Sequence, residues 1–93
     1  MKDSVMENYR AQLDELDNEI VALILKRMSV CEEIGHYKKA HNIPMMQPHR
    51  VQFVKEKAAR LAEAAQLNPQ FIEAIYTLII QEACELQTKI IDP

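Results

Sequence analysis

Two positively charged side chains lie where the sequence pattern calls for apolar ones. The alternating spacing of three and four residues that marks one face of a helix selects Leu13, Leu16, Ile20, Leu23, Arg27, Val30, Ile34 and Lys38. Burying an unpaired charge costs several kcal/mol, and no acidic residue shares this stripe between the two cations. We therefore interpret Arg27 and Lys38 as ligands for an anion. The alternative is that both side chains extend to the surface with only their stems buried.

The spacing of the cations limits how they could act together. Arg27 and Lys38 are 11 residues apart, which on a helix places them on the same side with Cα atoms about 16 Å apart. Two long side chains could then bind one small anion from its two ends. Arg10 lies about 25 Å before Arg27 and about 100° around the helix. It could reach a site only on the partner of an antiparallel helix pair, and otherwise it is a solvated surface arginine.

Two further polar residues stand out in the later part of the chain. Gln87 shares a predicted apolar seam with Ile80, Ala83 and Ile90. It is either a core glutamine satisfied by neighbouring backbone or a part of the site. Arg50 would lie in the first turn of a helix, where a cation is unfavourable for the helix dipole. A bound carboxylate would make use of both Arg50 and the helix N-terminus.

No arrangement for metal, cofactor or covalent chemistry is recognisable. The three histidines lack the spacing of metal ligands, and no cysteine pair accompanies them. The sequence contains no Ser-His-Asp arrangement, glycine-rich phosphate loop or dinucleotide fingerprint. If the protein is an enzyme, we expect it to act without metal, cofactor or covalent nucleophile, through shape and electrostatic stabilisation.

The composition indicates an all-α protein. The 93 residues include one glycine and four prolines, with 48% apolar and 27% charged residues, which suits one domain spanning residues 1–93.

The charge and the apolar runs limit the possible partners. The net charge of −3 excludes a broad basic surface for binding nucleic acid. No apolar run approaches the roughly 20 residues of a membrane span, and the N-terminus lacks a signal-peptide pattern. Cys31 and Cys84 fall in helical patterns and are predicted to be reduced packing residues. We expect a cytoplasmic protein.

Three helices are predicted. The first runs from about Val5 to about Ala40, on the order of 50 Å at the usual helical rise. A helix this long needs more cover than the rest of the chain supplies, so a homodimer that pairs two long helices is the simplest expectation. Gly35 inside it suggests a close approach of backbone or ligand. Pro48 and the pair Asn68-Pro69 open the second and third helices.

These residues resemble the all-helical class of chorismate mutase over roughly residues 6–90. The matching stretches are Tyr9-Arg10, Leu13, Leu16-Asp17, Ile20, Leu23, Lys26-Arg27, Glu33 to Lys38, Ile43-Pro44, Pro48 to Arg50 and Ile79 to Gln87. The resemblance implies an intertwined homodimer of three-helix protomers, each site being completed by an arginine of the other chain. It implies the cofactor-free Claisen rearrangement of chorismate to prephenate. Arg27, Arg50 and the partner's Arg10 would bind the two carboxylates, while Lys38 and Gln87 would donate to the ether oxygen.

Three positions depart from the family pattern. Gln47 and Val51 replace the acidic residues that contact the ring hydroxyl of chorismate, and Ala83 replaces a small hydroxyl residue. A relative on the same fold, isochorismate pyruvate lyase, also lacks the second acid. Another relative rearranges 4-amino-4-deoxychorismate, whose ammonium group would be unfavourable here unless another acceptor exists. The length of the loop from Lys38 to Arg50 favours a mutase. The non-enzymatic alternative is a helical regulatory or dimerisation module.

Overall fold

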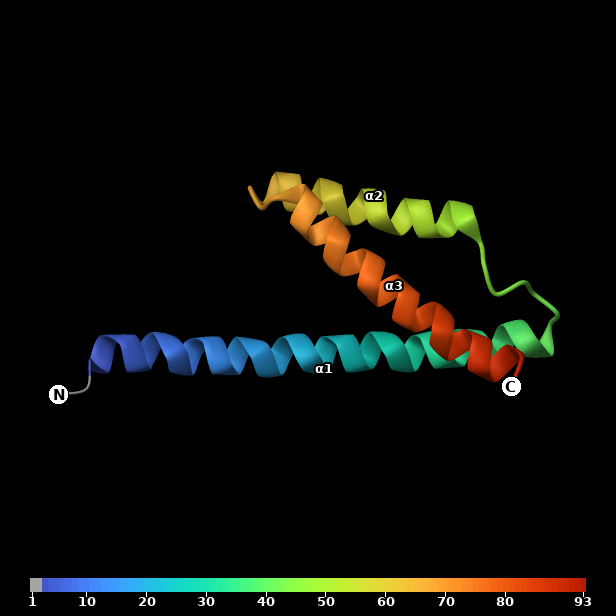
Figure 1. Cartoon of the computed structure of the whole chain (residues 1–93), viewed down its shortest axis with the longest axis horizontal. Coiled ribbons are helices and arrows are strands. Elements are labelled where there is room, and N and C mark those ends of the chain that lie inside the picture. The colour runs from blue at the N-terminus through green and yellow to red at the C-terminus, as the bar shows by residue number, and fades with distance from the viewer. Residues whose placement is uncertain (1–2) are drawn as a thin grey trace.

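The computed structural model describes residues 3–93, which form three helices joined by two short connections (Figure 1). They are α1 (Ser4–Ala40), α2 (Pro48–Ala64) and α3 (Pro69–Ile91). The described residues contain no strand. The all-α prediction is confirmed, and α1 begins one residue earlier than expected. None of these helices is both long enough and apolar enough to cross a membrane.

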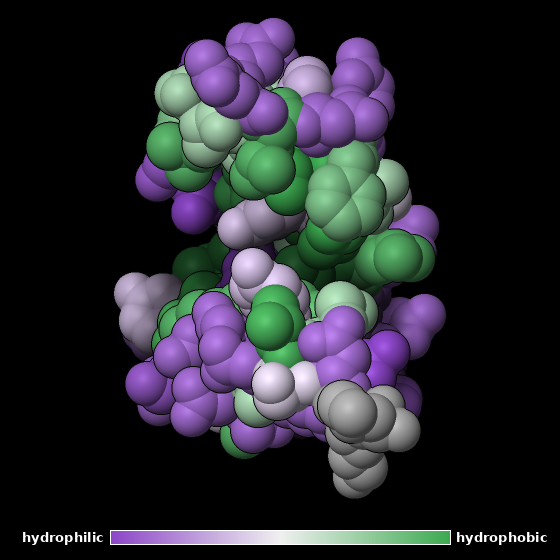
Figure 2. Space-filling view, turned by 90° about the vertical axis from the view of Figure 1, so that its left-hand side faces the viewer, coloured by the Kyte–Doolittle hydropathy of each residue, from purple (hydrophilic) through white to green (hydrophobic). Residues whose placement is uncertain are grey.

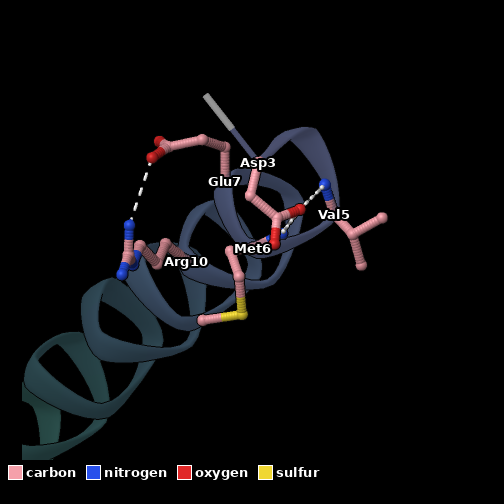
Figure 3. Close-up of polar contacts among 5 residues, drawn as sticks. All are labelled: Asp3, Val5, Met6, Glu7 and Arg10. Carbon is pink, nitrogen blue, oxygen red and sulfur yellow. Dashed lines mark hydrogen bonds and ion pairs between the residues drawn. The ribbon is translucent and has the colours of Figure 1, made fainter. Parts of the chain in front are cut away.

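Local capping explains where the helices begin. The Asp3 carboxylate accepts hydrogen bonds from the backbone N–H groups of Val5 and Met6 at 3.1 and 3.3 Å (Figure 3). The Asn68 side chain accepts from the Gln70 N–H at 3.0 Å, and Pro69 occupies the first helical position behind it. Pro48 likewise occupies the first turn of α2, but the side chain of Gln47 before it makes no capping hydrogen bond. These are the starts that the sequence predicted for α2 and α3.

The helices do not form a closed bundle. Within residues 3–93, α3 packs against both α1 and α2, whereas α1 and α2 do not contact each other. Figure 1 shows α3 running obliquely from the end of α2 to the C-terminal part of α1, while the N-terminal half of α1 projects alone. The chain measures 61 × 27 × 14 Å with a radius of gyration of 17.4 Å. A compact chain of this length would have a radius of about 12 Å.

The hydrophobic core of the described residues is small. Its buried apolar side chains are three alanines, Ala58, Ala62 and Ala83, and no large side chain is fully buried. The predicted stripe of α1 is exposed at Leu13, Leu16, Ile20 and Leu23. Figure 2, a view from the N-terminal end of α1, shows hydrophobic side chains in the hollow between the helices and hydrophilic ones outside. This chain alone therefore leaves much of its apolar surface in water.

Gly35 lies at a close approach of α1 and α3. It is a buried residue of α1, and a Cβ atom added to it would lie 3.2 Å from Gln87 Cγ and 3.2 Å from Ile90 Cδ1. This is closer than ordinary van der Waals contact. The close approach predicted at this glycine is confirmed, and the approaching element is α3. The contact brings Gln87 against α1.

Candidate active site

A cavity of about 270 Å³ lies between the three helices and the connection from α1 to α2. Its volume is close to the lower end of the range for small-molecule sites, roughly 300–1,000 Å³. Seven of the eight residues that the sequence selected line this cavity: Arg27, Lys38, Gln47, Arg50, Val51, Ala83 and Gln87. They come from all three helices and the connecting segment. The eighth, Arg10, lies elsewhere.

Lys38 and Gln87 form the polar centre of the cavity. The Lys38 Nζ atom donates to Gln87 Oε1 at 2.9 Å and to the Met45 carbonyl at 2.8 Å. Gln87 Nε2 donates to the Cys31 carbonyl at 3.0 Å, and the Gln87 residue is only 6% exposed. The Lys38 ammonium group therefore points inward, against the alternative that it extends to the surface. Gln87 is held partly by backbone, as a core glutamine would be, and partly by a cation.

This network leaves donors available to a ligand. An ammonium group has three N–H bonds and an amide nitrogen has two. Two of the Lys38 protons and one of the Gln87 protons are used by the bonds above. One proton remains on each nitrogen, and the two nitrogens belong to residues in direct contact. Both residues line the cavity, so one donor on each nitrogen remains for a ligand bound there.

Two arginines border the same cavity without a carboxylate partner. The Arg27 guanidinium is 5.9 Å from the ring centroid of Tyr76, and Arg50 is 5.2 Å from that of Phe53. Among residues 3–93 the only ion pair joins Arg10 to Glu7. A cationic guanidinium over an aromatic face keeps its charge and its forked donors. Arg27, Arg50 and Lys38 together make the cavity positively charged and suited to a compact dianion.

Arg10 lies near the opposite end of α1 and does not line this cavity. Its Nη1 atom is 3.2 Å from Glu7 Oε1, and both side chains are more than half exposed (Figure 3). Because α1 is one continuous helix, Arg10 is about 25 Å along its axis from Arg27. It cannot reach the cavity of its own chain. Its role in a partner's site stays a prediction.

The sequence did not identify every residue at this cavity. The carbonyl groups of Cys31 and Met45 orient Gln87 and Lys38, but backbone acceptors leave no trace in a side-chain pattern. The remaining wall is formed by the side chains of Cys31, Ile34, Met45, Met46, Val54, Ile80 and Cys84. The helical period could have found the two cysteines, because one lies a turn after Arg27 and the other a turn before Gln87. No group of three or more potential metal ligands occurs in the part of the chain that is described.

Comparison with known proteins decides the family. The family of chorismate mutase type II matches residues 9–88. The chain belongs to this family. Membership agrees with the three-helix architecture and with the resemblance found in the sequence. The chorismate mutase fold therefore accounts for nearly the whole chain, including every residue that lines the cavity.

Individual relatives differ in the substrate that their names give. A 4-amino-4-deoxychorismate mutase of Streptomyces pristinaespiralis is 39% identical over 88% of this chain and 64% of its own length. Another, of Streptomyces venezuelae, is 38% identical over 88% of this chain and 80% of its own. A chorismate mutase of Methanocaldococcus jannaschii is 24% identical over 89% of this chain and 84% of its own. The chain thus spans somewhat less than two thirds of the first of these relatives.

Proposed function

We propose that this chain is a homodimeric mutase that rearranges chorismate to prephenate without a cofactor. The observation that carries the proposal is the Lys38–Gln87 pair, which retains two unused donors in the cavity that Arg27 and Arg50 also line. Family membership supports the reaction class. The reaction is an isomerisation: the bond from the ether oxygen to the ring breaks as a carbon–carbon bond forms, and no atom is gained or lost.

The cations and the amide would act at different stages. Arg27 and Arg50 would each bind a carboxylate and hold the flexible enolpyruvyl arm over the ring, so that the reacting carbons meet. Negative charge develops on the ether oxygen as its bond breaks. Donors placed beforehand, on Lys38 and Gln87, stabilise that charge more in the transition state than in the ground state. Losing one such donor typically costs about 3 kcal/mol, or a hundredfold in rate.

We further propose that a second copy covers the N-terminal half of α1 and supplies Arg10 to the site. The exposed stripe of Leu13, Leu16, Ile20 and Leu23 supports this assembly, because each such side chain contributes about 1.5–3 kcal/mol when fully buried. In an antiparallel pair of α1 helices, the N-terminal end of one lies beside the C-terminal end of the other. The partner's Arg10 would then stand near the cavity. Each site would thus need both chains.

A second candidate substrate is 4-amino-4-deoxychorismate. The two relatives of 38–39% identity carry that name, which favours an amine in place of the ring hydroxyl. Gln47 and Val51 line the cavity where the family's acids would contact that group, and the Gln47 amide oxygen can accept a hydrogen bond from either substituent. We keep chorismate as the first proposal because no carboxylate of residues 3–93 lines the cavity to pair with an ammonium group. Its product would serve aromatic amino acid biosynthesis in the cytoplasm.

The test is to incubate the purified protein separately with chorismate, 4-amino-4-deoxychorismate and isochorismate, and to identify the products by NMR. Prephenate formed from chorismate with the higher kcat/KM supports the first proposal, and a preference for the amino compound supports the second. Pyruvate and salicylate from isochorismate would instead identify a lyase. No reaction with any of the three, together with binding to another protein, would indicate a regulatory module. Treatment with a chelator should leave the rate unchanged.

A further inference from the structure

Two thiols lie in the wall of the cationic cavity, and the proposed rearrangement uses neither of them. Cys31 on α1 and Cys84 on α3 are both free and partly exposed. Both line the same cavity as Arg27, Lys38 and Arg50. Any small anion that enters to meet these cations therefore passes within reach of a thiol. A substrate pocket must admit small molecules from solution, so this access persists in a dimer.

The surroundings of the two thiols differ. Arg27 Nη1 lies 3.9 Å from Cys31 Sγ and donates toward it. The Cys31 carbonyl also accepts the Gln87 bond that orients the amide. No cationic group of the described residues lies within hydrogen-bonding distance of Cys84 Sγ. A cation beside a thiol attracts an anionic reagent to that sulfur, and Cys31 has such a neighbour in Arg27. Cys31 is therefore the thiol placed for anion-directed chemistry.

We propose that Cys31 is a covalent modification site for small anionic disulfides, and that its thiolation blocks the cavity until it is reduced. The Cys31 thiol loses its proton to water, and its sulfur attacks one sulfur of the disulfide. The old S–S bond breaks, a new one forms to Cys31, and the leaving thiolate takes the electron pair. The protein thiol is oxidised and the reagent disulfide is reduced, so the exchange balances.

The charge of the cavity gives this site its selectivity. Arg27, Lys38 and Arg50 raise the local concentration of an anionic reagent. Where charges focus the field in a cleft, this effect increases association rates by roughly ten- to a thousandfold. The same cations stabilise a negative leaving thiolate. A neutral disulfide gains neither advantage. Once attached, an aromatic group would occupy much of a cavity of about 270 Å³ and lie beside the Arg27 and Gln87 groups assigned to substrate.

The experiment compares two aromatic disulfides on the whole protein, dianionic dithiobis(nitrobenzoate) and uncharged dithiodipyridine. Thiolate release is followed by absorbance in stopped flow, and the labelled cysteine is identified by peptide mass spectrometry. Rates are divided by those of the same chain in denaturant, which removes the intrinsic reactivity of each reagent. We expect a preference of at least about tenfold for the dianion at Cys31, lost in high salt. Arg27→Ala should reduce the preference, while Lys39→Ala on the exposed side of α1 should not.

Matched variants locate the reaction. Cys31→Ser and Cys31→Ala should lose the fast, charge-selective phase, and Cys84→Ser should keep it. Labelling of Cys84 instead of Cys31 in the wild-type chain, or equal normalised rates for the two reagents, would overturn the proposal even if a variant failed to fold. A fast phase that survives in either Cys31 variant would overturn it as well.

The effect on the site is measured separately, and this part rests on the proposed function. Thiolation should abolish turnover of chorismate in the wild type, a dithiol should restore it, and bound prephenate should slow the labelling of Cys31. Full turnover by the labelled protein would refute the blocking role. If charge-selective labelling of Cys31 occurs but no chorismate-type compound reacts or protects, the modification site stands and the proposed function fails.

Discussion

The two halves of α1 carry the same stripe but meet different partners. In the C-terminal half, residues 26–40, α3 packs against the stripe at Gly35, and the polar positions Arg27 and Lys38 border a cavity. In the N-terminal half, residues 4–25, Leu16 and its neighbours on the stripe are at least half exposed. One periodic pattern thus serves two purposes. The half that α3 partly covers forms the candidate site, although Val30 and Ile34 within it remain exposed. The other half offers a surface for the proposed second copy.

The largest expected effect comes from charging the uncovered half. Leu16→Glu would place a carboxylate in the proposed helix pairing, where an unpaired charge costs several kcal/mol. We expect loss of the dimer in light scattering, a lower melting temperature and no detectable turnover. Asn18→Glu, which adds the same charge on the other face of α1, should change none of these. A Leu16→Glu protein that stays dimeric and active would contradict the assigned role of this surface.

In the covered half, Lys38→Ala should affect chemistry rather than assembly. The variant removes one of the two donors at the polar centre, and we expect kcat/KM to fall by about a hundredfold or more, roughly 3 kcal/mol. Steady-state kinetics and circular dichroism separate this loss from misfolding. Lys39→Ala is the matched control, because Lys39 is exposed and follows directly in the sequence. Turnover that survives Lys38→Ala within tenfold would show that the assigned role is wrong.

Gln87→Glu should make activity depend on pH. A carboxylate cannot donate to the Cys31 carbonyl or to an ether oxygen, whereas a protonated acid donates one hydrogen bond. The side chain of a glutamic acid has a pKa of about 4.3 in water. Activity should therefore be highest in acid and fall as the pH rises. The wild-type amide does not titrate, so its profile should be flatter. A variant that is equally active at neutral and acidic pH would argue against amide donation by Gln87.

The smallest expected effect is that of Gly35→Ala. The new methyl group would meet Gln87 Cγ and Ile90 Cδ1 at 3.2 Å, and overpacking of this kind costs about 1–3 kcal/mol. The higher helix propensity of alanine returns roughly 1 kcal/mol. We expect a slightly lower melting temperature and a several-fold drop in kcat as Gln87 shifts. Ser29→Ala, exposed on the same helix, should be neutral or slightly stabilising. A Gly35→Ala variant that is more stable and fully active would show that the contact between α1 and α3 can accommodate a methyl group.

Local signals made most of the fold predictable from sequence. Pro48 and Asn68-Pro69 mark helix starts through their own backbone chemistry. The length of the stretch over which apolar residues recur with helical spacing predicts the length of α1. The selection of Arg27, Lys38 and Gln87 came from their position on apolar seams. The pairing of Lys38 with Gln87, 49 positions apart, depends on the angle at which α3 crosses α1. The use of the Cys31 and Met45 carbonyl groups as acceptors depends on that crossing and on the path of the connection between α1 and α2. A local sequence pattern predicts neither the crossing angle nor this path.

Mixing two inactive variants tests most directly whether each site is built from two chains. Arg10→Ala and Arg27→Ala homodimers should each be nearly inactive. When equal amounts are unfolded together and refolded, half of the dimers are mixed, and each mixed dimer contains one site with both arginines intact. We expect recovery of about a quarter of the wild-type activity, as random pairing in a twofold dimer requires. A mixture no more active than its components would show that Arg10 does not act in the partner's site.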